Sequence, residues 1–429
     1  MTDLAIQSKP SRVKQALSAH SAMGVAISAV LYIICLSGTL SVFKDEISLF
    51  EQGRVPVVTA LSGDALMTAA DAGMQAEPDS AHLFIHMPTA AKPYALVQTD
   101  NTENFITPEG EISAARHQPW SDFLIDLHYY LHLPKSFGML IVAMFGVFLF
   151  AMSVSGVLAH PKIFKDAFAF RRTKSEQIKQ VDLHNRLSVW TMPFHLSNSL
   201  TGAMIGLATL SALAVATMDY DGDTGAVFGP VFGTEPPVNE APASMARIDL
   251  AMSQVTENFG HTRPVYAILH DPNTQGQYLQ IMAEHPRRLI YAEKYNFNGA
   301  GEFLGTVGSS DGEIGQQVAD SVYKIHFGAF GGLPVKIAFG VFGVCLLFII
   351  TAGMKIYFIK QAAKGKAVPA IQRAWQAIVW GAPVLLAITF LMTRVGFAMP
   401  MLQWVFWGGL ALYVCVQILR VKRVNISTP

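Results

Sequence analysis

Four histidines in this chain precede long apolar stretches, and the intervals that follow them occur twice. His20 and His184 are each followed 18 residues later by the glycine of a Ser-Gly or Thr-Gly pair. His128 is followed 28 residues later by the glycine of a Ser-Gly pair, and His326 is followed 27 residues later by the glycine of Thr351-Ala352-Gly353. The first pair is separated by 164 residues and the second by 198. The glycines concerned are Gly38, Gly202, Gly156 and Gly353.

This duplicated pattern predicts a specific chemistry. Neutral imidazole is a good axial ligand for haem iron, and two axial histidines give a centre suited to electron transfer. Such a site needs two histidines on different helices at equal depth. Topology places His20 level with His184 and His128 level with His326. We therefore expect two bis-histidine haems of the b type, although helix-end histidines at a membrane interface are the ordinary alternative.

Three further histidines are secondary candidates for haem binding. His195 follows His184 by eleven residues, so it should lie about 16 Å deeper near the same face of the helix. Its counterpart in the first half is Leu31. A histidine at that depth is a functional candidate, as a ligand, a proton relay or a partner of nearby polar groups. His132, one turn after His128, and His160, which competes with His20, are the others.

The remaining histidines favour ordinary surface or core roles, and we expect no metal beyond haem iron. The acidic residues Asp219, Asp221 and Asp223 resemble a calcium loop only weakly, because the distal glutamate is missing, and predict a solvated turn. Several aromatic residues flank the outer histidines and either pack on haem or anchor the chain at the membrane interface. They are Trp120, Phe123, Tyr129, Tyr130, Tyr323 and Phe327.

Composition indicates how these histidines are positioned. The 429 residues are 51% hydrophobic and only 14% charged, which is typical of a membrane protein. Six apolar runs are long enough to cross a bilayer, which takes roughly 20 residues. They cover residues 21–43, 137–159, 188–217, 335–358, 375–393 and 399–419. The first run lacks a cleavage site and is interpreted as a retained anchor.

The net charge of the chain is zero, and we expect no nucleic-acid partner.

The basic residues predict the orientation. If six helices span, all the basic clusters fall on one side, which is cytoplasmic by the positive-inside rule. Both termini are then cytoplasmic, and the two long connections face the periplasm across a bacterial inner membrane. The clusters are Lys9, Arg12 and Lys14; Lys162, Lys165, Arg171, Arg172, Lys174 and Lys179; Lys360, Lys364, Lys366 and Arg373; and Arg420, Lys422 and Arg423.

The two long connections each show a helical pattern followed by strands. Helices are expected at 62–76 and 244–259, and strands at 82–87, 93–99, 103–107, 264–270, 276–283 and 287–295. The fold class is therefore an α-helical integral membrane protein with six transmembrane helices and two small α+β modules. A helix–module–helix unit is duplicated and two helices are added. The segments are 1–44, 45–134, 135–218, 219–333, 334–360 and 361–429.

With these motifs and modules the chain resembles the PepSY-associated transmembrane proteins, which include inner-membrane ferric-siderophore reductases. The resemblance covers about residues 14–360. It rests on Leu17–His20, on the Asp-Leu-His triplets that end at His128 and His184, and on Ile325–Gly328. It implies that the outer modules are PepSY domains. It also implies a ferric siderophore or another Fe(III) chelate as the electron acceptor.

Other motifs narrow the function further. The sequence contains no P-loop, dinucleotide fingerprint or nucleophile motif, and no inner loop large enough for a flavin domain. Electrons must then come from a quinol or from a separate cytoplasmic reductase. The prediction is a membrane haem reductase acting in iron uptake. The alternatives are a proton- or ion-coupled transporter centred on His195, and a non-enzymatic PepSY anchor that regulates a protease.

Overall fold

The computed structural model describes residues 12–160, 162–168, 171, 175–233, 236–307 and 310–426, with side chains to residue 421. The basic residues Lys9, Arg172 and Lys174, and the side chains of Lys422 and Arg423, lie outside the described part. The chain forms two compact units, which are described separately. A helical unit contains Met1–Lys44, Pro119–Leu207 and Leu333–Pro429, and a sheet unit contains Asp45–Gln118 and Ala208–Gly332.

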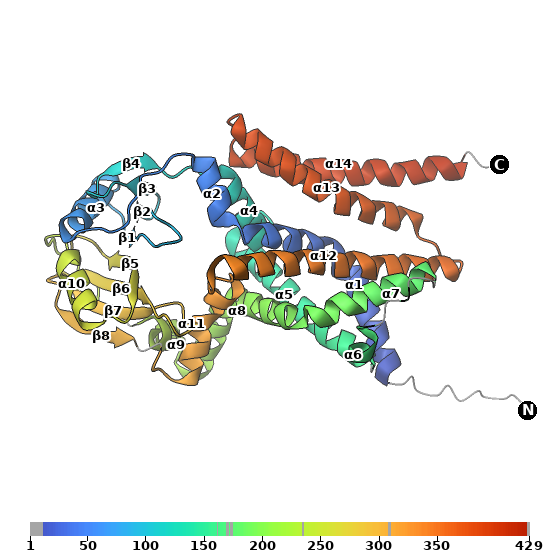
Figure 1. Ribbon diagram of the computed structural model, residues 1–429, viewed down its shortest axis with the longest axis horizontal. Helices are drawn as coiled ribbons and strands as arrows, with labels where there is room; N and C mark the ends of the chain where they lie inside the picture. The colour runs from blue at the N-terminus through green and yellow to red at the C-terminus, as the bar shows by residue number, and fades with distance from the viewer. Residues whose placement is uncertain are drawn as a thin grey trace, which may run out of the picture. The chain divides into compact units, whose positions relative to one another are not determined.

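The helical unit contains the long helices of the chain (Figure 1). Six helices are long and apolar enough to cross a membrane, as the sequence predicts. Their windows contain at most two charged residues each, so they suit a lipid environment in which only helices satisfy their own backbone. These helices are α1 (Arg12–Ser41), α5 (Lys135–Ala159), α8 (Met192–Asp219), α12 (Gly332–Ala363), α13 (Pro369–Arg394) and α14 (Met399–Ile426). The boundary between the units falls within α8.

Three shorter helices of this unit are α4 (Pro119–Tyr130), α6 (Ile163–Asp166) and α7 (Glu176–Trp190). Two of them adjoin a spanning helix across a break. Between α4 and α5, Leu131 and His132 adopt positive φ angles of 53° and 58° before Pro134. A residue preceding proline is disfavoured in helical geometry, so the chain cannot continue straight. Between α7 and α8, the break falls at Thr191, just ahead of Pro193, whose missing N–H removes one helical hydrogen bond.

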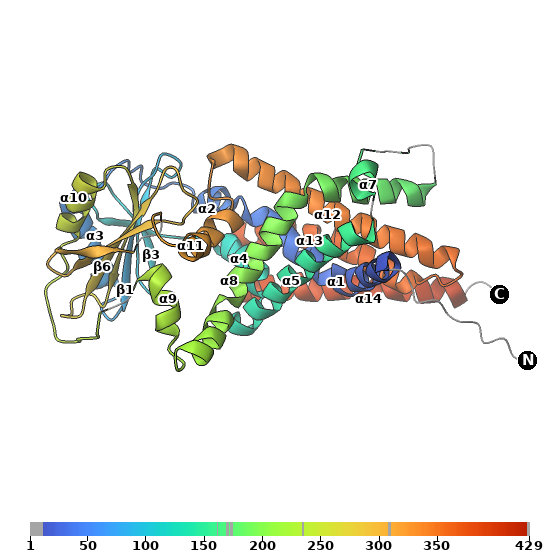
Figure 2. The same ribbon diagram turned by 90° about the horizontal axis from the view of Figure 1, so that it is seen from below.

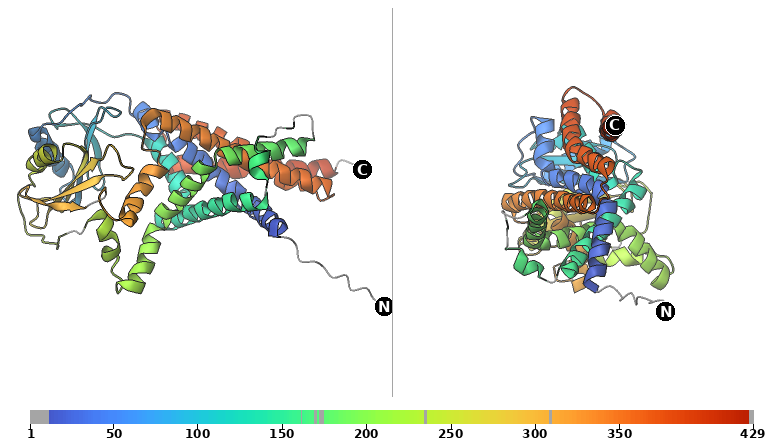
Figure 3. Two further views of the ribbon diagram at one scale, coloured as in Figure 1. Left: turned by 60° about the horizontal axis from the view of Figure 1, so that its bottom comes forward. Right: turned by 90° about the vertical axis from the view of Figure 1, so that its right-hand side faces the viewer.

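The helices α13 and α14 pack against each other and against α1 and α4 (Figure 3). The indole Nε1–H of Trp120 in α4 donates to Leu386 O at 3.2 Å and to Thr389 Oγ1 at 3.1 Å, both in α13. The hydroxyl of Tyr32 in α1 donates to Val379 O at 3.2 Å. The two added helices, to which sequence analysis gave no role, therefore brace the first half of the repeat.

The sheet unit joins both outer connections in one eight-stranded antiparallel sheet of order β4-β3-β2-β1-β5-β6-β7-β8 (Figure 2). Its centre is the pairing of β1 with β5, in which Leu83 lies opposite Leu269. The strands are β1 (His82–His86), β2 (Ala95–Gln98), β3 (Glu103–Ile106), β4 (Ile112–Ala115), β5 (Arg263–His270), β6 (Tyr278–Glu284), β7 (Glu293–Asn298) and β8 (Phe303–Val307). The helices are α2 (Lys44–Gln52), α3 (Gly63–Ala76), α9 (Thr224–Phe232), α10 (Ile248–Asn258) and α11 (Ile314–His326).

One hydrophobic core serves both outer modules. Leu66 of α3 and Val255 of α10 are buried with Leu83, Leu269 and Phe297 from the strands. Each module is small for an independent core, and joining the two doubles the apolar surface that a single core can bury. The α+β modules that the sequence predicts are thus two halves of one sheet.

The structure corrects one predicted strand. Residues 287–295 were expected to be extended, but the strand begins only at Glu293. Pro286 cannot donate to a ladder, and the backbone N–H of Arg287 donates to His285 Nδ1 at 3.1 Å, which closes a turn. The strands β4 and β8 and the helices α9 and α11 were not predicted.

Candidate functional site

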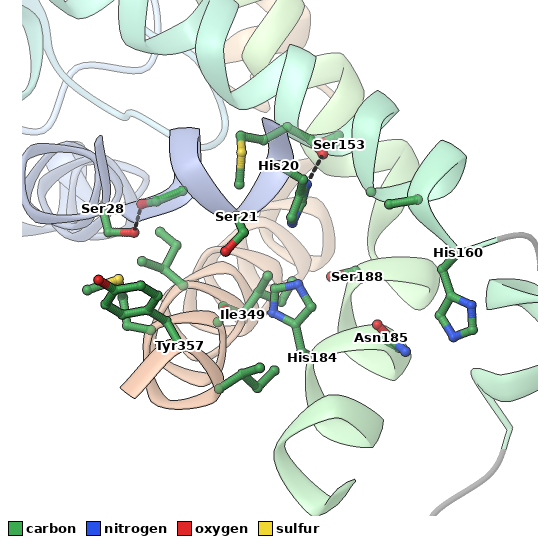
Figure 4. Close-up of a pocket in the computed structure, with 18 of the residues that line it drawn as sticks. His20, Ser21, Ser28, Ser153, His160, His184, Asn185, Ser188, Ile349 and Tyr357 are labelled. Carbon is green, nitrogen blue, oxygen red and sulfur yellow. Dashed lines mark hydrogen bonds between the residues drawn. The ribbon is translucent and has the colours of Figure 1, made fainter. Parts of the chain in front are cut away.

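The structure brings His20 and His184 together. His20 projects from α1 and His184 from α7, and their ring centroids are 6.2 Å apart at an interplanar angle of 82°. Figure 4 shows the two rings close to each other in a cavity of the helical unit, with His160 set apart from them. Segments 164 residues apart in the chain therefore present the same residue to the same point.

Both rings are oriented through the same nitrogen. His184 Nδ1 lies 2.9 Å from Ile349 O, a carbonyl that can only accept. His20 Nδ1 lies 3.1 Å from both Met152 O and Ser155 Oγ. The Ser155 hydroxyl donates to Met152 O, so its oxygen is left to accept from His20. This network assigns the proton to Nδ1 in both rings and leaves the Nε2 lone pairs for a ligand.

Glycines of the neighbouring helices pack against these rings. A Cβ atom at Gly156 in α5 would lie 3.3 Å from His20 Cε1, and one at Gly353 in α12 would lie 3.3 Å from His184 Cε1. Gly38 in α1 has the same relation to His128 in α4, where a Cβ would lie 2.5 Å from Cε1. Three of the four recurring glycines, Gly38, Gly156 and Gly353, thus pack against a histidine of another helix and not against the histidine that precedes them in the sequence.

His128 repeats the orientation of the inner pair. Its Nδ1 lies 2.9 Å from Ile34 O of α1, as His184 Nδ1 lies against Ile349 O of α12. His128 is placed near the end of the separate helix α4, not at the start of a spanning helix as expected. The repeated carbonyl contact shows that His128 and His184 are held in the same way.

His326 is the last residue of α11 in the sheet unit, and its ring lies 5.7 Å from that of Phe327. A buried ion pair fixes α11 to the sheet. Lys294 Nζ of β7 lies 2.8 Å from Asp320 Oδ1, and both side chains are 2% exposed. The backbone N–H of Tyr291 also donates to Asp320 Oδ2 at 3.1 Å. This anchor was missed in the sequence, because Lys294 and Asp320 lie 26 residues apart in elements that were poorly predicted.

The paired histidines line a cavity of about 400 Å³ between α1, α5, α7, α8 and α12. The lining is mostly apolar. Polar groups occur around the histidine pair and toward the basic end of α12, where Tyr357 and Lys360 lie. A pocket of this size with few polar groups is typical of a cofactor site. The polar members besides the histidines include Ser21, Ser28, Ser153, Asn185 and Ser188.

His195 lines the same cavity and is 4% exposed. Its Nε2 lies 2.5 Å from Thr191 Oγ1. Its Nδ1 is buried and meets no hydrogen-bond partner among the described residues. The helix break at Thr191 means that His184 and His195 lie on two helices, whereas the sequence predicted one. Both nonetheless line the one cavity.

The other two secondary candidates have partners of their own. His132 Nε2 lies 2.9 Å from Phe123 O, and His132 Nδ1 accepts from the indole Nε1–H of Trp407 at 3.1 Å. Both nitrogens are thereby engaged, which favours a structural role. His160 caps α5, and its Nε2 lies 3.2 Å from Asp166 Oδ2. This contact favours a capping role at the end of the helix.

The basic loop before α7 is closed by an ion pair that sequence analysis did not detect. Asp182, two residues before His184, is 1% exposed and accepts from the guanidinium and the backbone N–H of Arg171. The hydrogen bond from Arg171 lowers the pKa of Asp182 below its ordinary value. Arg171 thus pins the segment that presents His184.

The remaining predicted residues have ordinary contacts. Asp223 caps α9, its carboxylate accepting from Gly225 N and Ala226 N. Trp120 and Phe123 pack against rings of α13 and α14, namely Phe390 and Phe406. His82 Nδ1 lies 3.0 Å from Asp100 Oδ1 on the sheet. Across the described residues, no group of three or more His, Cys, Asp or Glu side chains is arranged to hold a metal ion.

Six helices able to span a membrane, a sheet built from two similar modules and histidines oriented by backbone carbonyls define a multi-pass membrane protein built from an internal repeat. The family profile described as the PepSY-associated TM region matches residues 17–360, and the chain belongs to this family. It is also similar to an uncharacterized protein of Pseudomonas aeruginosa, with 33% identity over 132 residues. That match covers 31% of this chain and 33% of the relative, so it spans about a third of either protein.

Proposed function

We propose that this protein is a haem-containing reductase of a bacterial inner membrane that passes electrons to a periplasmic ferric siderophore or other Fe(III) chelate. The observation that carries the proposal is the inner histidine pair. Its rings lie 6.2 Å apart, with each Nδ1 turned to oxygen atoms of a neighbouring helix. Imidazoles that ligate a metal commonly donate their other N–H to a carbonyl in this manner.

The residues present fit a bis-histidine haem. An imidazole–metal bond is about 2 Å long, so two imidazoles on one metal have ring centres roughly 6 Å apart. Gly156 and Gly353 leave room beside each ring that a larger residue would fill. The mostly apolar cavity suits a macrocycle, and Lys360 and Tyr357 at its polar end suit carboxylate groups.

The chain's residues would act as follows. His20 and His184 would hold the inner haem, and His128 and His326 are the ligand candidates for the outer haem. When bound, bis-histidine haem b supplies reversible one-electron transfer. The carbonyls of Ile349 and Ile34 keep the rings of His184 and His128 in the ligating tautomer. The glycines allow close packing against these rings, and the apolar lining excludes water from the site.

The proposed orientation follows from charge. The basic residues that flank the spanning helices support an orientation with both termini in the cytoplasm and the sheet unit in the periplasm. The sheet unit would then face the acceptor. Reduction suits iron release, because hard oxygen ligands hold Fe(II) far more weakly than Fe(III). The electron donor is a quinol or a cytoplasmic reductase.

A dithionite-reduced minus oxidised visible spectrum of the detergent-purified protein tests the proposal. We expect sharp b-type bands and, by pyridine haemochrome, two haems per chain. His184→Ala should remove about half of the haem, as should His20→Ala, and the double variant should lose no more than either single variant. His285→Gln in the sheet unit is the matched control and should keep both haems.

A colourless protein from haem-replete cells would overturn the proposal. A coloured protein whose haem content is unchanged in both His184→Ala and His20→Ala would also overturn the assignment of the inner pair. Reduction of a ferric hydroxamate by the dithionite-reduced protein, followed by trapping of Fe(II), then tests the acceptor.

A further inference from the structure

The deep end of the cavity contains one polar atom that the proposed haem site does not use. His195 in α8 is 4% exposed, and its Nδ1 has no partner in the described part of the chain. An unsatisfied buried polar atom costs about 1–3 kcal/mol, so such an atom usually marks a bound ligand or water. His195 and Leu31 occupy equivalent positions of the two halves, 164 residues apart, and both line the cavity.

The hydrogen bonds of Thr191 determine whether His195 Nδ1 donates or accepts. The Thr191 hydroxyl donates its hydrogen to Leu187 O at 2.7 Å. Its oxygen must therefore accept from His195, whose Nε2 lies 2.5 Å away. The proton is thus on Nε2, and Nδ1 of the neutral ring carries a lone pair. The cavity presents an acceptor, and the missing partner is a donor.

The depth of this acceptor excludes most donors. Leu31 lies eleven residues along the continuous helix α1 from His20, or about 16 Å. Leu149 of α5 and Leu346 of α12 also line the cavity, each three residues before a residue whose carbonyl meets His20 or His184. A buried water needs two to four polar partners, but the leucines offer none, and the Ser28 hydroxyl one turn before Leu31 already donates its hydrogen to Gly24 O. We therefore expect an occupant that is apolar over most of its surface and carries a hydrogen-bond donor, such as a hydroxyl.

We infer that the deep end of this cavity binds a quinol, one of whose hydroxyl groups donates a hydrogen bond to His195 Nδ1. This inference rests on the proposed function and chooses between its two electron donors. A quinol is soluble in the bilayer and reaches a site between spanning helices, whereas a cytoplasmic reductase does not. Its apolar ring can pack beside Leu31, and its hydroxyl can donate a hydrogen bond to the lone pair of His195 Nδ1.

The overall reaction balances with the proposed acceptor. One quinol becomes one quinone and gives up two electrons and two protons. The two electrons reduce two Fe(III) chelates to Fe(II). Nδ1 of His195 receives the proton of the hydroxyl that it binds. This proton and the second one are released to the aqueous phase when the quinone leaves, which resets His195 for the next turnover.

Binding of 2-heptyl-4-hydroxyquinoline N-oxide, a fluorescent quinol analogue with a hydroxyl donor, tests the site without any turnover. Quenching of its fluorescence by the full-length protein gives the affinity. Two variants of His195 separate the two nitrogens. The oxygen of His195→Asn replaces Nδ1, whereas the amide of His195→Gln reaches only the place of Nε2.

We expect His195→Asn to bind within about threefold of the wild type and His195→Gln to bind at least about tenfold more weakly. Leu31→Trp fills the deep end without altering His195 and should also abolish binding, which guards against a folding defect at His195. His285→Gln should bind as the wild type does. Each variant is first checked for a single gel-filtration peak and for its reduced-minus-oxidised spectrum.

Equal binding by all these variants would overturn the quinol site. A wild-type protein that shows the haem spectrum but does not quench the analogue would overturn it as well, and would leave the proposed function standing. The expected binding pattern in a protein without haem bands would support the quinol site and overturn the proposed function instead.

Discussion

The helices α4 and α11 occupy equivalent places in the two halves of the repeat, and each carries one of the outer histidines, His128 or His326. They are held by different means. α4 is bound to α13 and α14, through Trp120 and through His132, which accepts from Trp407. α11 is bound to its own sheet, through the ion pair of Lys294 with Asp320 and that of Lys324 with Glu284.

This difference can be traced in the sequence. At the 198-residue offset, Trp120 corresponds to Val318 and His132 corresponds to Phe330. The second half thus lacks the polar aromatic side chains by which the first half contacts α13 and α14. Each half therefore fixes the helix that carries its histidine by local contacts of its own.

The largest effect should follow from breaking the anchor of α11. In Lys294→Met the carboxylate of Asp320 stays buried without its partner, which typically costs about 3–5 kcal/mol. Hydrogen exchange of peptides covering 314–326 should accelerate accordingly, while peptides covering 119–130 keep their protection. The exchange rates of both sets of peptides are measured in one experiment on the full-length protein.

The double variant Lys294→Met with Asp320→Leu is the control for this change. Replacing both charges with apolar groups should restore most of the protection, because no unpaired charge remains. Wild-type exchange in the single variant would contradict the role of the pair. Fast exchange in 119–130 as well would contradict the independence of the two anchors.

A smaller effect is expected at the glycines that pack against the histidines. In Gly38→Ala the new Cβ would lie 2.5 Å from His128 Cε1, so the ring or α1 must move at a cost of about 1–3 kcal/mol. In Gly156→Ala the contact with His20 is 3.3 Å, which a shift of a few tenths of an ångström relieves. For the haems proposed above, the low-spin resonances of the centre assigned to His128 should change in the first variant, and those of the centre assigned to His20 should stay unchanged in the second. The reverse result would contradict the close packing of Gly38 on His128.

Much of this architecture could be predicted from the sequence, but few of the contacts that hold the helices α4 and α11 could. Six spans and most strands follow from composition and periodicity, because a lipid or core face imposes a regular pattern. The crossed contact of Gly156 with His20 could not be predicted, since spacing along one helix does not say which neighbour it meets. The bond from Trp407 to His132 joins residues 275 apart, and no local signal marks it. The break at Thr191 was overlooked although Pro193 was its signal.

The anchor of α4 should respond modestly to loss of one side-chain donor. Trp120→Phe keeps the aromatic packing on Phe390 and removes the donor to Leu386 O and Thr389 Oγ1. The cost should be about 1 kcal/mol, seen as earlier thermal unfolding in detergent. Trp380→Phe, at a residue of α13 that is 70% exposed, is the matched control and should change little. Equal shifts in both variants would mean that the indole hydrogen bonds do not hold α4.

The smallest effect should be a response of α11 to acid. Burial raises the pKa of Glu284, but its pairing with Lys324 and Arg263 outweighs burial, and the pKa lies below its ordinary value. The pair therefore contributes fully above the unfolded value of about 4.3, and its contribution is lost as the pH falls through the lower folded pKa. Near-ultraviolet circular dichroism of the full chain, to which Tyr323 of α11 and the neighbouring Tyr291 contribute, should change slightly below pH 4. Glu284→Gln should remove that step, and the first half offers no equivalent. If the step persists in the variant, another group loosens α11 in acid and the Lys324–Glu284 pair is not part of its anchor.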